Sequence, residues 1–261
     1  MTKSLVFGLL SFFLCSATYA LDQLPGNKFF LITQLAPPSN QLDLLELQEH
    51  DLSPPHPAEK YNREHHFGTW IDFSDEPSCL TTRGLVLARD TTAPIEVYPN
   101  DSCYVSKGQW HDPYTNQEFV DAKEVQVDHV VPLKEAYIAG AYKWPWKKRC
   151  AYFNFIGNDY HLIPVDGPTN AKKSDKGPDR WMPPSQQFHC EYVSHWLHIK
   201  AIWNLMLSED EVLAIRQIIK SNRCNPNLFK MSSGELNQQR AAIKDIEKQC
   251  PASAAPLEQT N

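Results

Sequence analysis

Three side chains of complementary chemistry stand out in the sequence: the carboxylate of Asp128, the imidazole of His129 and the amide of Asn170. Carboxylate and amide oxygens are hard ligands for a divalent cation, and an imidazole can accept a proton from water near neutral pH. Together these groups would suit metal-assisted hydrolysis of a phosphodiester. The dipeptide Asp128-His129 is weak evidence alone, because such pairs arise by chance and a histidine at a strand end is often structural.

The element that must carry the first two residues is a strand. Residues Val125–Val131 begin with alternating apolar and polar side chains and are rich in β-branched residues, and Pro132 then ends the pattern. Neighbouring side chains of an extended strand point to opposite faces, so Asp128 and His129 serve one site only if the strand ends or twists there. The position of Pro132 predicts such an early end.

A second strand and a helix must carry the third residue. The apolar run His161–Val165 predicts the strand, and Asp166 and Pro168 supply a capping-type residue and a proline suited to a first helical turn. Asn170 should therefore lie near the start of a helix. Two stretches between the strands, 133–142 and 146–153, have helical composition. The predicted order is strand, helical excursion, strand, helix.

Several linked motifs carry a family resemblance. They are V-Q-V-D-H-V-V-P-L-K-E-A-Y from Val125, N-D-Y-H-L-I-P-V from Asn158, and T-N-A-K-K-S-D-K-G-P-D-R-W-M-P-P from Thr169, with F-G-T-W-I-D, T-T-R-G-L-V-L and C-Y-V-S-K-G-Q-W-H-D-P-Y upstream. These motifs resemble the HNH-type nuclease domain at the C-terminus of GmrSD restriction enzymes and in many small secreted bacterial proteins. The resemblance covers about Tyr61 to Trp203.

The resemblance implies an α+β fold: a ββα-metal (HNH) core with a helical insertion between its strands, a small β-rich N-terminal part and C-terminal helices. It also implies roles for the three residues. His129 would be the general base that deprotonates the attacking water, while Asp128 and Asn170 would hold the metal. The implied cofactor is a divalent cation, Mg²⁺ first, with Mn²⁺ and Zn²⁺ as alternatives.

His161 departs from the family, which usually has asparagine at this place in the second strand. The family residue generally braces the base, so His161 is expected to do so through one ring nitrogen. The alternatives are a third metal ligand, a second acid-base group, or a histidine that only packs locally.

Basic and aromatic residues near this unit are candidates for substrate contacts. Gripping of the phosphate backbone is expected from residues that follow Asn170, namely Lys172, Lys173, Lys176 and Arg180. The alternative is a solvated helix face. Base stacking is open to Trp110, Trp144, Trp146 and Trp181, which are expected mainly to pack. Arg83 is expected to be a buried ion-pair member.

The first twenty residues predict a secretory signal peptide, because Lys3 precedes an apolar run that ends in small residues before Leu21. Six cysteines then remain for an oxidising compartment: Cys79, Cys103, Cys150, Cys190, Cys224 and Cys250. Three disulfides are expected. Neighbour order alone suggests Cys79 with Cys103, Cys150 with Cys190, and Cys224 with Cys250. No C-x-x-C pair suggests structural zinc.

The expected organisation has five parts: residues 1–20 as signal peptide, 21–59 as a Pro-rich arm or linker, 60–207 as the nuclease-type domain, 208–250 as C-terminal helices and 251–261 as a disordered tail. The formal net charge of -6 argues mildly against an ordinary nucleic-acid binder. The placement of the positive charge therefore matters more than its total.

The leading hypothesis is an exported endonuclease, secreted or periplasmic, without stable membrane association, that cuts DNA with low sequence specificity. RNA is the alternative substrate. Its protein partners are unknown. A second hypothesis is a non-catalytic binding module that keeps the nuclease fold as a scaffold. A third is a zinc hydrolase of peptides or cell-wall amides that uses Asp128, His129 and His161 as ligands.

Overall fold

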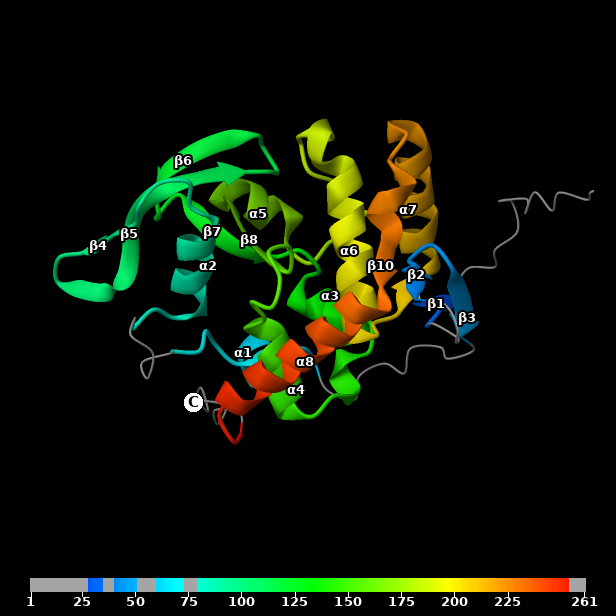
Figure 1. Ribbon diagram of the computed structural model, residues 1–261, viewed down its shortest axis with the longest axis horizontal. Helices are drawn as coiled ribbons and strands as arrows, with labels where there is room; N and C mark the ends of the chain where they lie inside the picture. Colours follow the sequence, from blue (N-terminus) through cyan, green and yellow to red (C-terminus); the bar gives the residue numbers. More distant parts are fainter. Residues whose placement is uncertain (1–27, 35–39, 51–59, 73–78, 254–261) are drawn as a thin grey trace, which may run out of the picture.

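The computed structural model describes residues 28–34, 40–50, 60–72 and 79–253. The expected signal peptide and most of the expected tail lie outside these residues. The strands are β1 (Phe29–Ile32), β2 (Gln41–Asp43), β3 (Leu47–His50), β4 (Glu96–Tyr98), β5 (Asp101–Asp112), β6 (Gln117–Asp121), β7 (Val125–His129), β8 (Leu162–Asp166), β9 (Leu207–Ser208) and β10 (Lys230–Ser232). The helices are α1 (Arg63–Phe67), α2 (Thr82–Asp90), α3 (Leu133–Ile138), α4 (Trp146–Phe153), α5 (Gly167–Lys173), α6 (His189–Trp203), α7 (Glu209–Asn222) and α8 (Ser233–Gln249), with short 3₁₀ turns η1 (Ala141–Lys143), η2 (Gln186–Phe188) and η3 (Pro226–Phe229). The expected α+β class is confirmed (Figure 1).

Strands β7 and β8 form an antiparallel pair in which His129 lies opposite Leu162 and Val125 opposite Asp166. Helices α3 and α4 fill the excursion between them, and α5 begins directly after β8. The Asp166 side chain accepts a hydrogen bond from the backbone N–H of Thr169, and a proline lies in the first turn. The local signals of the sequence therefore produce the expected strand, helical segment, strand and helix.

The β-rich part before this unit is a three-stranded antiparallel sheet in the order β4-β5-β6, which stands out to one side of the molecule (Figure 1). A small separate core under it contains Leu87, Trp110 and Val125. Arg83 donates to the backbone carbonyls of Ala122 and Val125. In the described part of the chain Arg83 thus bonds to backbone oxygens, where the sequence suggested an ion pair.

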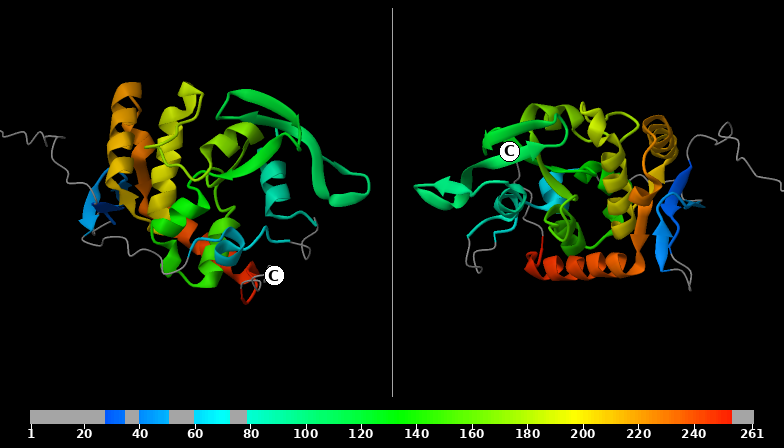
Figure 2. Two further views of the ribbon diagram at one scale, coloured as in Figure 1. Left: turned by 180° about the vertical axis from the view of Figure 1, so that it is seen from behind. Right: turned by 45° about the horizontal axis from the view of Figure 1, so that its top comes forward.

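The region expected to be an arm contributes strands to the far side of the molecule. Strand β1 lies between β3 and β9, and β2 pairs with β10 (Figure 2). These pairings join residues near the start of the described chain to residues near its end. Their apolar side chains, among them Phe30, Ile32 and Leu42, are buried in the main core.

Helix α6 runs through that core and is buried over most of its length, with Trp196 and Trp203 sealed from solvent. Helix α8 lies alongside α4 (Figure 2). No helix within the described ranges is long and apolar enough to cross a membrane.

Three disulfides connect these elements: Cys79–Cys103, Cys150–Cys250 and Cys190–Cys224. The first pairing agrees with neighbour order. The other two correct it, because α8 returns along α4 and brings its C-terminal cysteine to Cys150, while α7 returns along α6. Proximity in the fold, and not order in the chain, decides the partners.

Candidate active site

His129 is held at the end of β7 by one ring nitrogen. Its Nε2 lies 2.9 Å from the carbonyl oxygen of Phe153. Because a carbonyl only accepts, Nε2 carries the proton and Nδ1 is the unprotonated, basic nitrogen. Nδ1 has no hydrogen-bond partner among the described residues and keeps contact with solvent. Burial lowers the pKa of His129 well below its usual range, so the ring is neutral at pH 7.

Aromatic rings fix the plane of this imidazole. The Trp70 ring is nearly parallel to it, at 3° and 5.6 Å between centroids, and the Phe153 ring lies 5.0 Å away. Trp70 and Phe153 also contact each other, with centroids 4.5 Å apart. The base candidate therefore has both its tautomer and its orientation set by neighbours, as pre-organised acid-base groups require.

Asp128 is buried, with 6% of its surface exposed, and its carboxylate is already engaged. Lys173 Nζ lies 3.0 Å from one oxygen and 2.8 Å from the other, and the Tyr114 hydroxyl donates to the carboxylate at 2.6 Å. Burial raises the pKa of Asp128, while the Lys173 ammonium opposes that rise. Any cation bound by Asp128 must share it with these donors.

Lys173 requires a correction. The sequence suggested that it grips substrate phosphate, but its side chain is fully buried and also donates to the carbonyl of His129 at 2.9 Å. It lies three residues after Asn170 on α5, so both occupy one helix face. That spacing could have placed Lys173 toward β7 from the sequence.

Asn170 faces the same site from the middle of α5. Its Nδ2 donates to Gln126 Oε1 at 2.9 Å, which leaves its Oδ1 without a partner among the described residues. The first turn of α5, which Asp166 caps, places Asn170 next to Gln126 on β7. The amide therefore presents its oxygen as the free group.

A cleft of about 420 Å³ brings Asp128, His129 and Asn170 together. It also contains groups that the sequence did not single out, Arg63, Lys134 and Asp175. Lys134 Nζ lies 2.5 Å from Asp175, and the hydrogen bond from Lys134 lowers the pKa of that carboxyl. Arg63 comes from α1 and lies over the Phe153 ring at 5.1 Å. No local sequence signal links these residues to β7, because separate elements deliver them.

The other expected phosphate contacts do not line this cleft. Lys172 is exposed, Lys176 donates to the carbonyl of Lys172 at 2.7 Å, and Arg180 lies beside Asp179 at 3.1 Å. The cations that line the cleft are Arg63 and Lys134, and the buried Lys173 contacts Asp128. Lys172, Lys176 and Arg180 lie on the flank of α5 and the turn that follows it.

His161 lies on the core side of the hairpin. Its Nε2 is 2.8 Å from the carbonyl of Tyr152, the residue before Phe153, and its Nδ1 is buried without a partner. Burial lowers its pKa to about 3. Its ring centroid is 6.0 Å from that of His129, and it does not line the cleft. The geometry suits the bracing interpretation, and Asp128, His129 and His161 do not converge as a three-ligand zinc site would.

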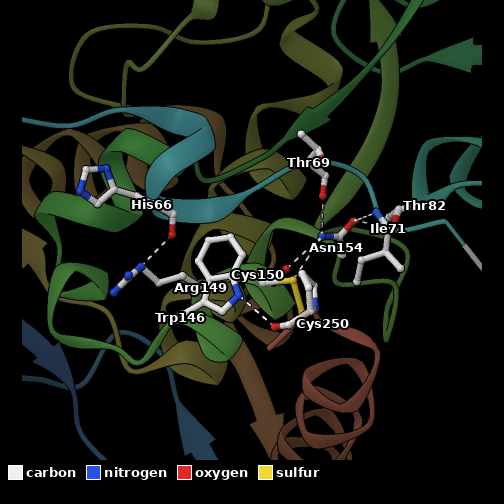
Figure 3. Close-up of a disulfide and its surroundings, with 10 residues drawn as sticks. His66, Thr69, Ile71, Thr82, Trp146, Arg149, Cys150, Asn154 and Cys250 are labelled. Carbon is white, nitrogen blue, oxygen red and sulfur yellow. Dashed lines mark hydrogen bonds between the residues drawn. A yellow bond between two sulfur atoms is a disulfide. The ribbon is translucent and has the colours of Figure 1, made fainter. Parts of the chain in front are cut away.

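The end of α4 that supplies both carbonyls is anchored on several sides (Figure 3). The Asn154 side chain accepts from Ile71 N at 2.8 Å and Thr82 Oγ1 at 2.6 Å, and donates to the carbonyls of Thr69 and Cys150 at 3.1 Å. Cys150 is bonded to Cys250 at the end of α8. The carbonyl that orients His129 is therefore rigidly placed.

The donor set of the cleft fits a hard divalent cation. Asp128 and Asn170 offer a carboxylate and an amide oxygen, and Mg²⁺ typically takes one or two protein oxygens together with water and phosphate oxygens. Within the described ranges no group of three or more His, Cys, Asp or Glu side chains is arranged to hold a metal. The site therefore suits a cation that substrate and water help to ligate.

Comparison with known proteins gives a consistent result. The profile of the family described as GmrSD restriction endonucleases, C-terminal domain, matches residues 84–216. An uncharacterized secreted protein of Arthroderma benhamiae is 34% identical over 168 residues, which are 64% of this chain and 78% of that protein. No solved structure matches the chain. The matched segment contains Asp128, His129 and Asn170.

Proposed function

Because the chain belongs to the family of GmrSD restriction endonuclease C-terminal domains, we propose that it is an exported, metal-dependent endonuclease that hydrolyses phosphodiester bonds of DNA, with RNA as an alternative substrate. The observation that carries this proposal is the state of His129. Its Nε2 is bound to a fixed carbonyl, and its basic Nδ1 opens onto the cleft that Asp128 and Asn170 line. The two short strands and α5 would then be the ββα-metal core of the HNH type.

In this mechanism His129 Nδ1 accepts a proton from the attacking water. The neutral ring is ready for this task, and the proton it gains is stabilised by the phosphate that it faces. Asp128 and Asn170 would hold the cation, Mg²⁺ first, which when bound supplies positive charge to a phosphate oxygen and the 3′ leaving oxygen. His161 holds its own carbonyl on α4 and thereby supports the geometry of His129.

Substrate phosphate would be held by Arg63 and Lys134 at the cleft, with Lys172, Lys176 and Arg180 extending the contact along the flank of α5. Such contacts fix the backbone and do not read the base sequence. Low sequence specificity follows. In a chain of net charge -6 these cations are the groups that would meet the phosphates.

Export, to the periplasm or the medium, accords with the predicted signal peptide, the three disulfides and the secreted relative. The test uses mature protein, residues 21–261 with disulfides formed, and supercoiled DNA in Mg²⁺, Mn²⁺, Zn²⁺ or EDTA. We expect nicking that needs a divalent cation and that falls by about 10²–10⁴-fold in His129→Ala, the contribution of a general base.

His111→Ala is the matched control, because His111 is exposed on β5 and pairs only with Glu118 among the described residues. It should cleave like the wild type. Full activity in His129→Ala would remove the base assignment. No cleavage in any metal would favour the binding-module hypothesis.

A further inference from the structure

A second pocket, of about 290 Å³, opens beside the cleft. Two indole rings, Trp70 and Trp146, line it, together with Ile71 and the disulfide-bonded Cys150. The carboxylates of Glu64 and Asp72 are its charged groups, and no lysine, arginine or histidine is among the described residues that line it. The pocket is aromatic and its charged groups are carboxylates, whereas the cleft has the cations Arg63 and Lys134 beside its carboxylates.

The two cavities share a wall. Trp70 lines the second pocket and stacks in parallel on His129, which lines the cleft. Phe153 lies between them, against Trp70, His129 and Arg63. The Trp70 ring, whose centroid lies 5.6 Å from that of His129, therefore separates the pocket from the candidate base.

We infer that this pocket, named here the Trp70/Trp146 pocket, receives an unstacked nucleobase of the substrate while the adjoining phosphate lies in the cleft. The inference rests on the proposed nuclease function and adds a substrate class to it. Phosphate is excluded from the pocket by Glu64 and Asp72, whereas ring and amino N–H groups of a base can donate to them. Indole faces are the surfaces on which bases stack.

The Trp70/Trp146 pocket is pre-organised. Trp146 Nε1 donates to the carbonyl of Pro251 at 3.0 Å (Figure 3). The ring also lies against Gly68. Gly68 has φ +82, and a Cβ there would lie 2.9 Å from the Trp146 ring. Of the other tryptophans that the sequence offered for stacking, Trp110 is buried, and Trp144 and Trp181 do not line this pocket. Trp70, which the sequence did not single out, is the second stacking surface.

A base that enters this pocket has left its helical stack, so the inference makes unpaired nucleotides the preferred substrate. Extracting a base from a duplex costs free energy that a single strand does not require. Thymine, which has a ring N–H but no amino group, should bind most weakly of the four DNA bases.

The test measures binding in EDTA, where no cleavage occurs, by fluorescence anisotropy. The probes are a labelled single-stranded oligonucleotide, its duplex, and an abasic oligomer of the same length. Trp146→Leu removes one stacking face without touching His129, and Trp146→Phe keeps an aromatic ring. We expect Trp146→Leu to weaken binding of the intact single strand about tenfold, with partial recovery in Trp146→Phe.

The abasic oligomer decides the interpretation. It should bind the wild type as weakly as the intact strand binds Trp146→Leu, and the substitution should leave its affinity unchanged. An equal loss on intact and abasic strands, or no loss on either, would overturn the inference.

Uncharged nucleosides separate this inference from the nuclease itself. They should quench tryptophan fluorescence in the wild type and much less in Trp146→Leu. Quenching by tetramethylammonium but not by nucleosides would make the pocket a cation cage and refute the inference. Nucleoside binding without metal-dependent cleavage would refute the proposed nuclease and leave the base pocket standing.

Discussion

Among the residues that the structure describes, two lysines are fully buried, and they have different roles. Lys173 on α5 faces one carboxylate, Asp128, and the carbonyl of His129. Lys200 on α6 faces two carboxylates, Glu135 and Glu211, at 2.9 and 2.8 Å, and the carbonyl of Met206 at 2.7 Å. Burial lowers the pKa of Lys173, with Asp128 opposing, whereas Glu135 and Glu211 overcome burial and raise the pKa of Lys200.

The surroundings of the two lysines differ in the same direction. Glu211 is closed off, since it also accepts from Trp196 Nε1 at 2.9 Å and from the backbone of Ser208 at 2.7 Å. Asp128 instead lines the open cleft. At Lys200, two carboxylates face one buried ammonium, and these ion pairs link α3, α6 and α7. A single buried pair at the edge of a cleft keeps a carboxylate ready for an external cation.

The largest expected effect is the loss of stability when Lys200, which pairs with Glu135 and Glu211, is replaced. Among the described residues, Lys200→Met leaves the buried Glu211 without a cation and Glu135 with only the exposed Arg180 at 3.9 Å. We therefore expect a loss of about 5 kcal/mol in the free energy of unfolding, the upper range for a broken buried pair. Denaturant titration measures it. Lys248→Met, which breaks the exposed pair with Asp245, should cost less than about 1 kcal/mol. A similar small loss in both variants would deny the structural role of Lys200.

Lys173→Met is expected to cost less, about 3 kcal/mol, because Asp128 keeps the Tyr114 hydroxyl and can gain water from the cleft. Mg²⁺ should restore part of this loss, since the freed carboxylate binds the cation more tightly and a ligand at 100 times its Kd adds about 2.7 kcal/mol. Stability measured with and without Mg²⁺ tests this. Equal gains in stability from Mg²⁺ in Lys173→Met, Lys200→Met and the wild type would show that Asp128 does not bind the cation.

His129 and His161 differ in a similar way, because His129 lines the cleft and His161 is enclosed in the core. His129 and His161 bond to successive carbonyls at the end of α4, but only the Nδ1 of His129 meets solvent. Burial lowers the pKa of His161 to about 3, so the unfolded chain takes up its proton first as pH falls. Stability is then lost from about pH 6.5 toward pH 3, at about 1.4 kcal/mol per pH unit for each such histidine.

His161→Asn, which has the residue usual in the family, should remove one of these contributions. Free energies of unfolding measured between pH 7 and pH 4 should fall less steeply in the variant than in the wild type, while metal-dependent cleavage at pH 7 is largely retained. An unchanged slope would show that His161 is not held neutral. A loss of cleavage as large as that of His129→Ala would make it a second acid-base group.

The parts that the sequence predicted depend on local signals. Strand β7, helix α4 and the start of α5 follow from β-branched alternation, helical composition and the Asp166 cap. The three candidate residues meet because these elements are adjacent. By contrast, the pairing of β1 with β9 and of β2 with β10 joins distant segments, and no residue near them carries a signal for the partner.

The same distinction applies within the candidate site. Arg63 and Lys134 reach the cleft from α1 and α3, which pack there through tertiary contacts that spacing does not encode. Lys173 was misread because a Lys-Lys run resembles a solvated face, although one member of such a run must turn inward on a helix packed against a strand. Cysteine order gave the wrong partners for two of the three disulfides because α8 folds back on α4 and α7 on α6.

The smallest expected effect concerns α5, the helix that carries Asn170 and Lys173. Helix α5 has only seven residues and depends on Asp166, whose side chain accepts from Thr169 N at 2.8 Å. Asp166→Ala should cost about 1 kcal/mol, the usual value of a helix cap. Ser232→Ala, which removes the same kind of cap from α8, is the matched control for stability.

The two cap substitutions should differ in their effect on cleavage. Asp166→Ala loosens the first turn of α5 next to Asn170, so cleavage should need a few-fold higher Mg²⁺ concentration for half-maximal rate, as expected when support of a metal ligand is weakened. Ser232→Ala should leave that concentration unchanged, and Asp166→Asn, which keeps an acceptor, should lie near the wild type. If both alanine variants lose stability but neither changes the Mg²⁺ requirement, the α5 cap does not support a metal ligand. The contrast with Lys200 would then rest on Lys173 and Asp128 alone, without Asn170.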